Sequence, residues 1–179
     1  MQRLSGIATT TSEYVNLIEG TSTRLLDTRK TTPTMRILEK YAVKTGGGTN
    51  HRIGLFDMIM LKDNHIDFAG GIEKAIDRTL QYLKDKQLDL KIEIEVRNFE
   101  ELQRVLAKGG VNRIMLDNFS VEDTQKAVKM IDHKYEIESS GGITAENILS
   151  YAQTGVDFIS VGALTHQIKS IDLSLLAED

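Results

Sequence analysis

The chain contains no cysteine among its 179 residues. This absence excludes disulfides, thiolate zinc sites and cysteine nucleophiles. No apolar run is long enough to cross a bilayer, and the first residues lack the apolar core of a secretory signal peptide. Together these features are typical of a protein from a reducing compartment, and we expect a cytoplasmic location.

Positive charge is not in excess either. Lysine and arginine number 22 against 26 acidic residues, for a net charge of −4. This balance argues against general binding to nucleic acid or membrane surfaces, so any cationic site must be a local cluster. With 40% apolar and 27% charged residues, the chain has an ordinary globular composition and enough length for one domain with a sizeable core.

Apolar runs alternate with segments of helical periodicity. Strand patterns occupy 24–28, 42–44, 57–61, 90–96, 113–116, 135–138 and 158–161, and helical patterns occupy 9–18, 34–41, 71–84, 98–106, 121–131 and 144–155. We expect the helix at 34–41 to turn Met35, Leu38 and either Tyr41 or Ala42 inward, and Thr144 to cap the last helix. Such alternation requires parallel strands joined by right-handed crossovers.

Two architectures satisfy this alternation, a doubly wound open sheet and a β/α barrel. Polar residues follow nearly every strand, and in a barrel all strand ends face one central mouth, whereas an open sheet concentrates them at one switch point. The pattern therefore favours a single domain over 1–179 that forms an incomplete, seven-stranded α/β barrel of the TIM type.

Five cationic side chains follow the early strands and loops: Arg29, Lys30, His51, Arg52 and Lys62. An arginine offers a planar fork matched to a carboxylate, and a lysine supplies a point charge. So many cations in one mouth repel one another unless an anion is bound. Ion pairs with neighbours such as Asp27 and Asp63 are the alternative for each cation taken alone. As a group, the cations predict a site for an anionic substrate.

Carboxylates form the second group. Glu95 shares one face of its strand with Glu93, and Asp117 ends the next strand. A buried carboxylate is costly unless it is paired or used. Glu95 and Asp117 would suit sugar hydroxyls, a metal ion or a developing positive charge. The alternative for Glu93 and Glu95 is the solvent-facing side of an edge strand.

Glycine turns form the third group. Ser140-Gly141-Gly142 leads from a strand into a helix, Gly162 follows the last strand, and His166 lies close behind it. Small residues let backbone N–H groups approach a phosphate, and barrels often bind phosphate in the loops after their last two strands. A plain strand-to-helix turn is the alternative. The run 46–48 is expected to be a flexible turn.

Several short stretches occur in one order along the whole chain: QRLSGIAT, LDTRKTTP, KTGGGTNHRIGLFD, MLKDNHI, IEIEV, IMLDNF, ESSGGIT and DFISVGALTH. As a set they resemble the quinolinate phosphoribosyltransferase family, also called nicotinate-nucleotide pyrophosphorylase (carboxylating). The resemblance implies an incomplete, seven-stranded barrel. It also implies the transfer of phosphoribose from phosphoribosyl pyrophosphate to quinolinate in NAD biosynthesis, which releases pyrophosphate and CO2 and requires Mg²⁺.

The resemblance also implies roles for individual residues. The two carboxylates of quinolinate would be held by Arg29, His51, Arg52 and Lys62, beside Thr28. Lys30 would lie between quinolinate and the pyrophosphate. Glu95 and Asp117 would contact the ribose hydroxyls and the Mg²⁺ shell. The 5′-phosphate side would be bound by Ser140, Gly141, Gly142, Gly162 and His166. Lys30, Lys62, Glu95 and Asp117 would carry the catalysis.

The sequence departs from the family in two respects. Thr34 stands where glycine usually follows TRKTTP. Family members also carry a further sandwich-like domain before QRLSGIAT, which covers the partner's active site in the family dimer and contributes an arginine. We therefore expect a homodimer or higher homo-oligomer for the family arrangement, and weak or no activity from this barrel alone.

Three other functions remain open at this point. One is a Schiff-base aldolase with Lys62 as nucleophile. Another is an anion-binding barrel without catalysis, and a third is nicotinate phosphoribosyltransferase. The stretches HRIGLFD and LKDNH favour the quinolinate enzyme, because a second carboxylate needs extra cations.

Overall fold

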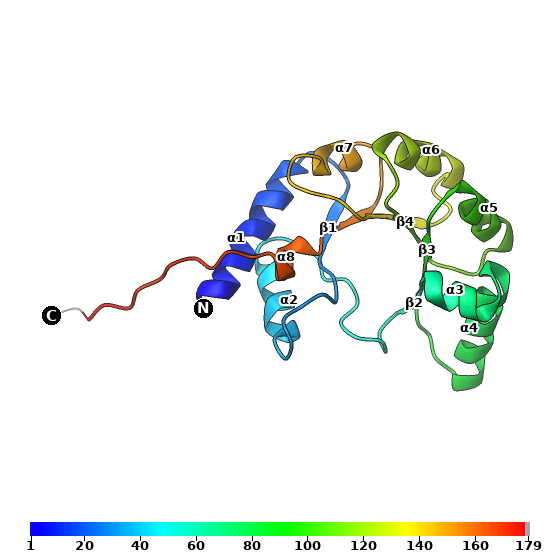
Figure 1. Cartoon of the computed structure of the whole chain (residues 1–179), viewed down its shortest axis with the longest axis horizontal. Helices are drawn as coiled ribbons and strands as arrows, with labels where there is room; N and C mark the ends of the chain where they lie inside the picture. The colour runs from blue at the N-terminus through cyan, green and yellow to red at the C-terminus, as the bar shows by residue number, and fades with distance from the viewer. Residues whose placement is uncertain (178–179) are drawn as a thin grey trace.

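Parallel strands curl into an incomplete barrel in the computed structural model, which describes residues 1–177 (Figure 1). The strands are β1 (Arg24–Leu26), β2 (Ile59–Leu61), β3 (Ile92–Val96), β4 (Arg113–Asp117), β5 (Glu136–Ser140) and β6 (Phe158–Ser160). They form one sheet in the order β1-β6-β5-β4-β3-β2, and every neighbouring pair is parallel. The predicted α/β barrel architecture is confirmed.

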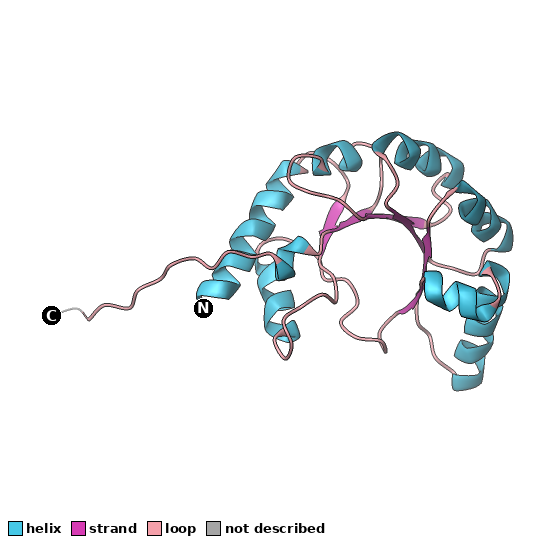
Figure 2. Cartoon of the chain, in the orientation of Figure 1, coloured by secondary structure: helices cyan, strands magenta, loops and turns pink. Residues whose placement is uncertain are grey.

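Helices lie mostly on the outside of this curved sheet (Figure 2). They are α1 (Gln2–Leu17), α2 (Arg36–Thr45), α3 (Asp63–Ala69), α4 (Ile72–Lys86), α5 (Phe99–Lys108), α6 (Val121–Ile131), α7 (Ile148–Ala152) and α8 (Ala163–His166). Asn98 and Ser120 cap α5 and α6 by accepting hydrogen bonds from Glu101 N and Asp123 N. The first helix begins at Gln2, well before the expected start at residue 9.

The prediction of seven strands is wrong by one strand. Residues 42–44 belong to α2, because a three-residue apolar run cannot be distinguished from a buried helical turn by its pattern alone. Thr49 instead lies beside β1 and pairs in parallel with Leu26 through an isolated bridge. Thr49 N donates to Leu25 O at 2.8 Å, and Asp27 N donates to Thr49 O at 3.2 Å. The sheet therefore stays open between this residue and β2.

The inward face of α2 also differs from the expectation. Ala42 and Val43 are buried, whereas Leu38 and Tyr41 are 47% and 68% exposed and Met35 is half-buried. The glycines after α2 do not form the expected flexible turn. They lie where the end of α2 passes close to α1. A Cβ atom on Gly46 would lie 2.3 Å from Ala8 O, which no side chain tolerates. Only glycine lets α2 end this close to α1.

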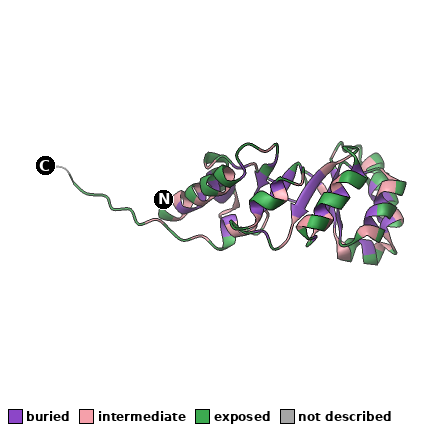
Figure 3. Cartoon of the chain, turned by 90° about the horizontal axis from the view of Figure 1, so that it is seen from above, coloured by how far each residue is buried: buried purple, intermediate pink, exposed green. Residues whose placement is uncertain are grey.

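The two faces of the sheet differ in chemistry. On the outer face, residues such as Ile94, Ile114 and Ile159 pack against the helices and form the apolar core. On the inner face, register brings charged residues together, since Glu93 lies beside Arg113 and Arg113 beside Glu136. Glu138 lies on the same face, beside Met115. Figure 3 shows buried residues along the strands and on the helix sides that face them. Glu93 and Glu95 are both buried, which overturns the solvent-facing alternative.

Candidate active site

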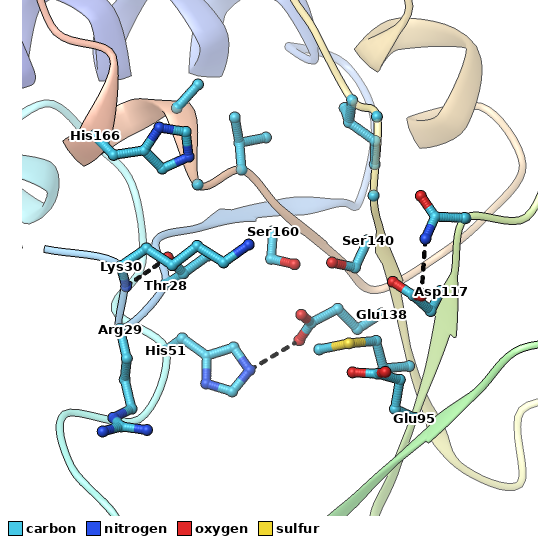
Figure 4. A pocket seen from close by; sticks show the side chains of 18 of the residues that line it. Thr28, Arg29, Lys30, His51, Glu95, Asp117, Glu138, Ser140, Ser160 and His166 are labelled. Atoms are coloured by element: carbon cyan, nitrogen blue, oxygen red, sulfur yellow. Dashed lines mark hydrogen bonds and ion pairs between the residues drawn. The ribbon is translucent and has the colours of Figure 1, made fainter. Parts of the chain in front are cut away.

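A cavity of about 760 Å³ opens at the carboxyl ends of the strands (Figure 4). Every residue that the sequence singled out for the site lines it: Thr28, Arg29, Lys30, His51, Arg52, Lys62, Glu95, Asp117, Ser140, Gly141, Gly142, Gly162 and His166. These residues come from strand ends that lie far apart in the sequence. Parallel strands in a barrel bring their carboxyl ends to one mouth, and this geometry gathers them.

The cationic wall of the cavity comes from the loops after β1 and α2. Within the described residues, no carboxylate lies within ion-pair distance of Arg29, Lys30 or Arg52. Burial lowers the pKa of Arg52, and the neighbouring charge of Arg29 lowers it further. These cations are therefore available to an anionic ligand, which would relieve their mutual repulsion.

A buried ion pair fixes the start of this wall. Asp27 binds Lys40 Nζ at 2.5 Å and the His51 backbone N at 2.8 Å, while Asn50 Nδ2 reaches its second oxygen at 2.7 Å. Lys40 also donates to His51 O at 2.9 Å. Burial raises the pKa of Asp27 and lowers that of Lys40, and their pairing opposes both shifts. Asp27 thus anchors the backbone before Arg52 and is not the partner of a pocket cation.

The opposite wall carries two carboxylates that line the cavity. Glu95, at the end of β3, pairs with Lys62 Nζ at 2.5 Å. Asp117, at the end of β4, accepts a hydrogen bond from Asn118 Nδ2 at 2.8 Å. Lys62 is held at the start of α3, where its backbone N donates to His65 Nδ1 at 3.0 Å. The cavity therefore presents cations and carboxylates on facing sides.

Beneath the cavity lies a buried charged cluster formed by His51, Glu93, Glu138 and Arg113. His51 Nε2 is 3.0 Å from Glu93 and 3.3 Å from Glu138, although neither oxygen lies along the N–H direction. Arg113 Nη1 contacts Glu138 at 3.1 Å. The guanidinium of Arg113 also stacks on Phe158, 3.9 Å from the ring centroid. The cluster balances charge inside the barrel, where an unpaired carboxylate would be costly.

The protonation of this cluster is set by competing effects. Burial lowers the pKa of His51, but the contacts with Glu138 and Glu93 outweigh it and raise the pKa to about 9. The Arg52 backbone N–H donates to Nδ1 at 2.7 Å and opposes a second ring proton. The contacts with the two carboxylates outweigh this one amide dipole, so the upward direction holds. Burial and the Glu138 charge raise the pKa of Glu93.

The glycine turns close the remaining side. Gly141 has φ +93°, and a Cβ atom there would lie 2.2 Å from Asn118 Oδ1. A Cβ atom on Gly162 would lie 2.8 Å from His166 Nε2. The expected Thr144 cap is wrong, because Asn147 Oδ1 accepts from Thr144 N and α7 begins only at Ile148. Phosphate binding here would rest on loop N–H groups, since α7 and α8 are too short to add a strong dipole.

Sequence reasoning missed several residues of the cavity wall. Glu138, Ser160, Met60 and Met115 all line it. The signal was present for Glu138 and Ser160, because each stands two positions from another inward residue, Ser140 and Phe158 respectively, and strand side chains alternate. The methionines carry no charge pattern that would mark them.

A parallel barrel with cations, carboxylates and glycine turns around one mouth defines an α/β-barrel domain whose site suits anionic ligands. The family model of the quinolinate phosphoribosyl transferase C-terminal domain matches residues 7–176. The chain belongs to this family.

Individual relatives agree with this membership. Quinolinate phosphoribosyltransferase [decarboxylating] 2b, mitochondrial, of Nicotiana tabacum is 44% identical over 98% of the chain. The probable nicotinate-nucleotide pyrophosphorylase [carboxylating] of Bacillus subtilis is also 44% identical over 98%, and the chain covers 59% of it. The solved nicotinate-nucleotide pyrophosphorylase of Francisella tularensis is 49% identical, with a TM-score of 0.91, and the match covers 97% of this chain and 60% of that one.

The chain spans about half the length of the curated relatives it matches, covering 53% of the Nicotiana tabacum protein. Through residue 177, no helix combines the length and apolar character needed to span a membrane.

Proposed function

We propose that this chain is the catalytic barrel domain of a quinolinate phosphoribosyltransferase. The substrates would be quinolinate and phosphoribosyl pyrophosphate, and the products nicotinate mononucleotide, pyrophosphate and CO2, as a step of NAD biosynthesis. The observation that carries the proposal is the cavity itself. All residues expected from the family resemblance surround one space. Three cations on one wall have no carboxylate partner among residues 1–177.

The residue types suit this chemistry. Arg29, Arg52 and Lys62 would bind the two carboxylates of quinolinate, with Thr28 beside them. His51 would act through its charge and through the Arg52 amide, because both of its ring nitrogens already face protein groups. This role differs from the direct carboxylate contact implied by the resemblance.

On the other side, Lys30 and the turns at 140–142 and 162–166 would bind the phosphate groups. Breaking the bond between ribose C1 and pyrophosphate builds positive charge on the ribose, which Glu95 and Asp117 would stabilise. Attack by the pyridine nitrogen then gives a pyridinium. The electron pair released when the C2 carboxylate departs as CO2 is stabilised by that cation, and a proton takes the place of the carboxylate. Positioning and electrostatics suffice, so no covalent nucleophile is needed.

Mg²⁺ fits the carboxylate wall as a partner of the pyrophosphate. This ion needs only one or two protein carboxylates when phosphate oxygens and waters fill the other positions. Asp117, whose only hydrogen-bond donor in the described chain is the Asn118 amide, and Glu95 would supply them. The buried trio His51, Glu93 and Glu138 could approach a metal geometrically, but Arg113 already neutralises it and imidazole suits Mg²⁺ poorly.

The remaining partners follow from the same proposal. A homodimer or higher homo-oligomer would cover exposed apolar side chains on α2 and the following loop, among them Ile37, Tyr41, Leu55 and Phe56. A cytoplasmic location remains part of the proposal, whereas a mitochondrial location is named for the Nicotiana tabacum relative. Neither nucleic acid nor a membrane is an expected partner at a net charge of −4.

The Schiff-base alternative finds no support at Lys62. An imine-forming lysine must be neutral, and that requires desolvation or a cationic neighbour. Lys62 instead pairs with Glu95 at 2.5 Å, so a carboxylate already occupies the nitrogen that would have to attack a carbonyl.

Calorimetry with quinolinate tests the proposal. Wild-type protein should bind quinolinate more tightly than nicotinate, because the second carboxylate finds its own cations. Arg52→Ala should weaken quinolinate binding by about 30-fold or more, as expected for loss of a charge-assisted contact. Arg104→Ala removes an exposed arginine paired with Glu73 outside the cavity and serves as the control.

A folded wild type that prefers nicotinate would instead support the nicotinate enzyme. Binding of both substrates without product, in protein that also includes the N-terminal domain of its relatives, would support an anion-binding barrel without catalysis.

A further inference from the structure

Arg3, near the start of α1, lies outside the cavity but ties together the segments that form its phosphate side. Its Nε donates to Glu39 Oε1 at 2.8 Å, and its Nη2 donates to Thr32 Oγ1 at 2.9 Å and to Thr165 O at 2.6 Å. These contacts join α1, α2, the loop after β1 and α8. A single guanidinium therefore connects four segments that are distant in sequence.

Arg3 is not available to a ligand. Its charge is neutralised by Glu39, which is fully buried and whose second oxygen accepts from Thr32 N at 3.0 Å. Burial raises the pKa of Glu39, but hydrogen bonds from Thr32 and Arg3 outweigh it and lower the pKa overall. The planar fork of arginine suits such a multiple contact, and lysine would not reproduce it.

Thr165 links this contact to the cavity. Its hydroxyl donates to Lys30 O at 2.7 Å and lies 3.3 Å from Gly162 O, while its own carbonyl accepts from Arg3. Lys30 is held at its other side as well, because its N–H donates to Thr28 Oγ1 at 3.0 Å. The side chain of Lys30 consequently passes beside Gly162. A Cβ atom added to Gly162 would lie 3.5 Å from Lys30 Cδ.

We propose that Arg3 and Thr165 are positioning residues that hold Lys30 against the 162–166 turn. The pair sets the spacing between the cation that faces the pyrophosphate and the turn that faces the 5′-phosphate. A site whose supporting contacts are fixed before binding loses less free energy when the ligand orders it. This inference rests on the proposed function for the identity of the ligand, but its structural content does not.

Substitutions at Thr165 separate positioning from packing. Thr165→Val keeps the shape of the fully buried side chain and removes the hydroxyl, whereas Thr165→Ser keeps the hydroxyl and removes a methyl group. Positioning predicts that Val weakens binding of phosphoribosyl pyrophosphate with Mg²⁺ by about tenfold, a loss equivalent to one hydrogen bond. Ser should stay within about threefold of wild type on the same grounds. Quinolinate binding should change little in either variant.

The matched control is Thr11, which is equally buried in α1 and donates to Ile7 O at 2.7 Å. Thr11→Val and Thr11→Ser should leave the affinity for phosphoribosyl pyrophosphate unchanged. Arg3→Lys should weaken the binding of phosphoribosyl pyrophosphate as much as Thr165→Val does. If Thr165→Ser weakens binding as much as Val, or if both variants weaken quinolinate equally, the role is packing alone and the inference is wrong.

Hydrogen exchange measures, without any ligand, how firmly Thr165 holds the backbone of Lys30. Thr165→Val should speed amide exchange at 30–32 and 163–166 relative to Thr165→Ser, with β3 and β4 unchanged. A wild type that does not bind phosphoribosyl pyrophosphate would contradict the proposed function. The exchange result would still test whether Thr165 positions Lys30. Equal exchange in the two variants would overturn this positioning role.

Discussion

Lys62 and Glu95, from the ends of neighbouring strands, form a 2.5 Å ion pair at the edge of the cavity. Each side chain is also a candidate ligand group, Lys62 for a carboxylate and Glu95 for the ribose or Mg²⁺. The pair therefore competes with substrate, and a dianion that binds Lys62 releases Glu95. In this arrangement the binding of quinolinate at Lys62 would free Glu95 for the ribose or for Mg²⁺.

Glu95→Gln should strengthen quinolinate binding and slow turnover. Removing the negative charge frees Lys62 for the substrate carboxylate, and a gain of a fewfold is expected because the pair is partly exposed and screened. Calorimetry on the variant measures the gain, and Glu100→Gln on the outer helix α5 is the control. Weaker binding by the variant would show that Glu95 itself supports quinolinate.

Arg113→Met should destabilise the fold by about 3–5 kcal/mol, the usual result of breaking a buried pair from one side. Glu138 would be left fully buried with His51 as its main counter-charge, and the stacking on Phe158 would be lost. Urea unfolding followed by circular dichroism measures the change. Arg104→Met, on an exposed pair, should change the free energy of unfolding by less than about 1 kcal/mol. Similar losses in both variants would contradict this account of the cluster.

The raised pKa of His51 predicts that the protein is more stable in mild acid than in mild base. Burial lowers this pKa, and Glu138 and Glu93 raise it to about 9, above the ordinary value of 6.5. The stabilisation is fully present below pH 6.5 and is lost as pH rises through about 9. The Arg52 amide also faces the ring and opposes its charge, and Arg113 shares the Glu138 carboxylate with it.

Melting temperatures between pH 6 and 9.5 measure this loss. They should fall with rising pH in the wild type, and the slope should flatten in His51→Gln. A wild-type slope that persists unchanged in the variant would assign it to other groups.

Thr34→Gly should stabilise the chain by about 0.5–1 kcal/mol. Thr34 has φ +66°, a left-handed conformation that is costly for a β-branched residue, and glycine removes that cost but adds freedom to the unfolded chain. Thermal unfolding measures the difference. Thr9→Gly, at an exposed position inside α1, should instead destabilise the chain by about 0.3 kcal/mol. A loss of stability at Thr34 would mean that its side chain contributes more than its backbone costs.

How far the sequence predicts the site depends on the kind of signal each residue carries. Arg29, Lys62 and Asp117 stand where an apolar run ends, so their place at a strand end follows from pattern alone. Glu138 lies inside β5, where alternation places it on the same face as Ser140. Alternation does not reveal its neighbour Met115, because the pairing of distant strands decides the register. Residues 42–44 were misassigned because three residues carry too little periodicity to separate strand from helix.

Thr49 joins the sheet through one bridge, whereas β3, β4 and β5 are joined by ladders of several residues. The segment from Asn50 to Met58, which carries His51 and Arg52, is therefore held mainly by side chains such as Asp27 and Asp57. Local opening of this segment costs far less than global unfolding because no ladder has to break. The cationic side of the cavity is thus the part of the site whose shape depends on side-chain contacts rather than on a strand ladder.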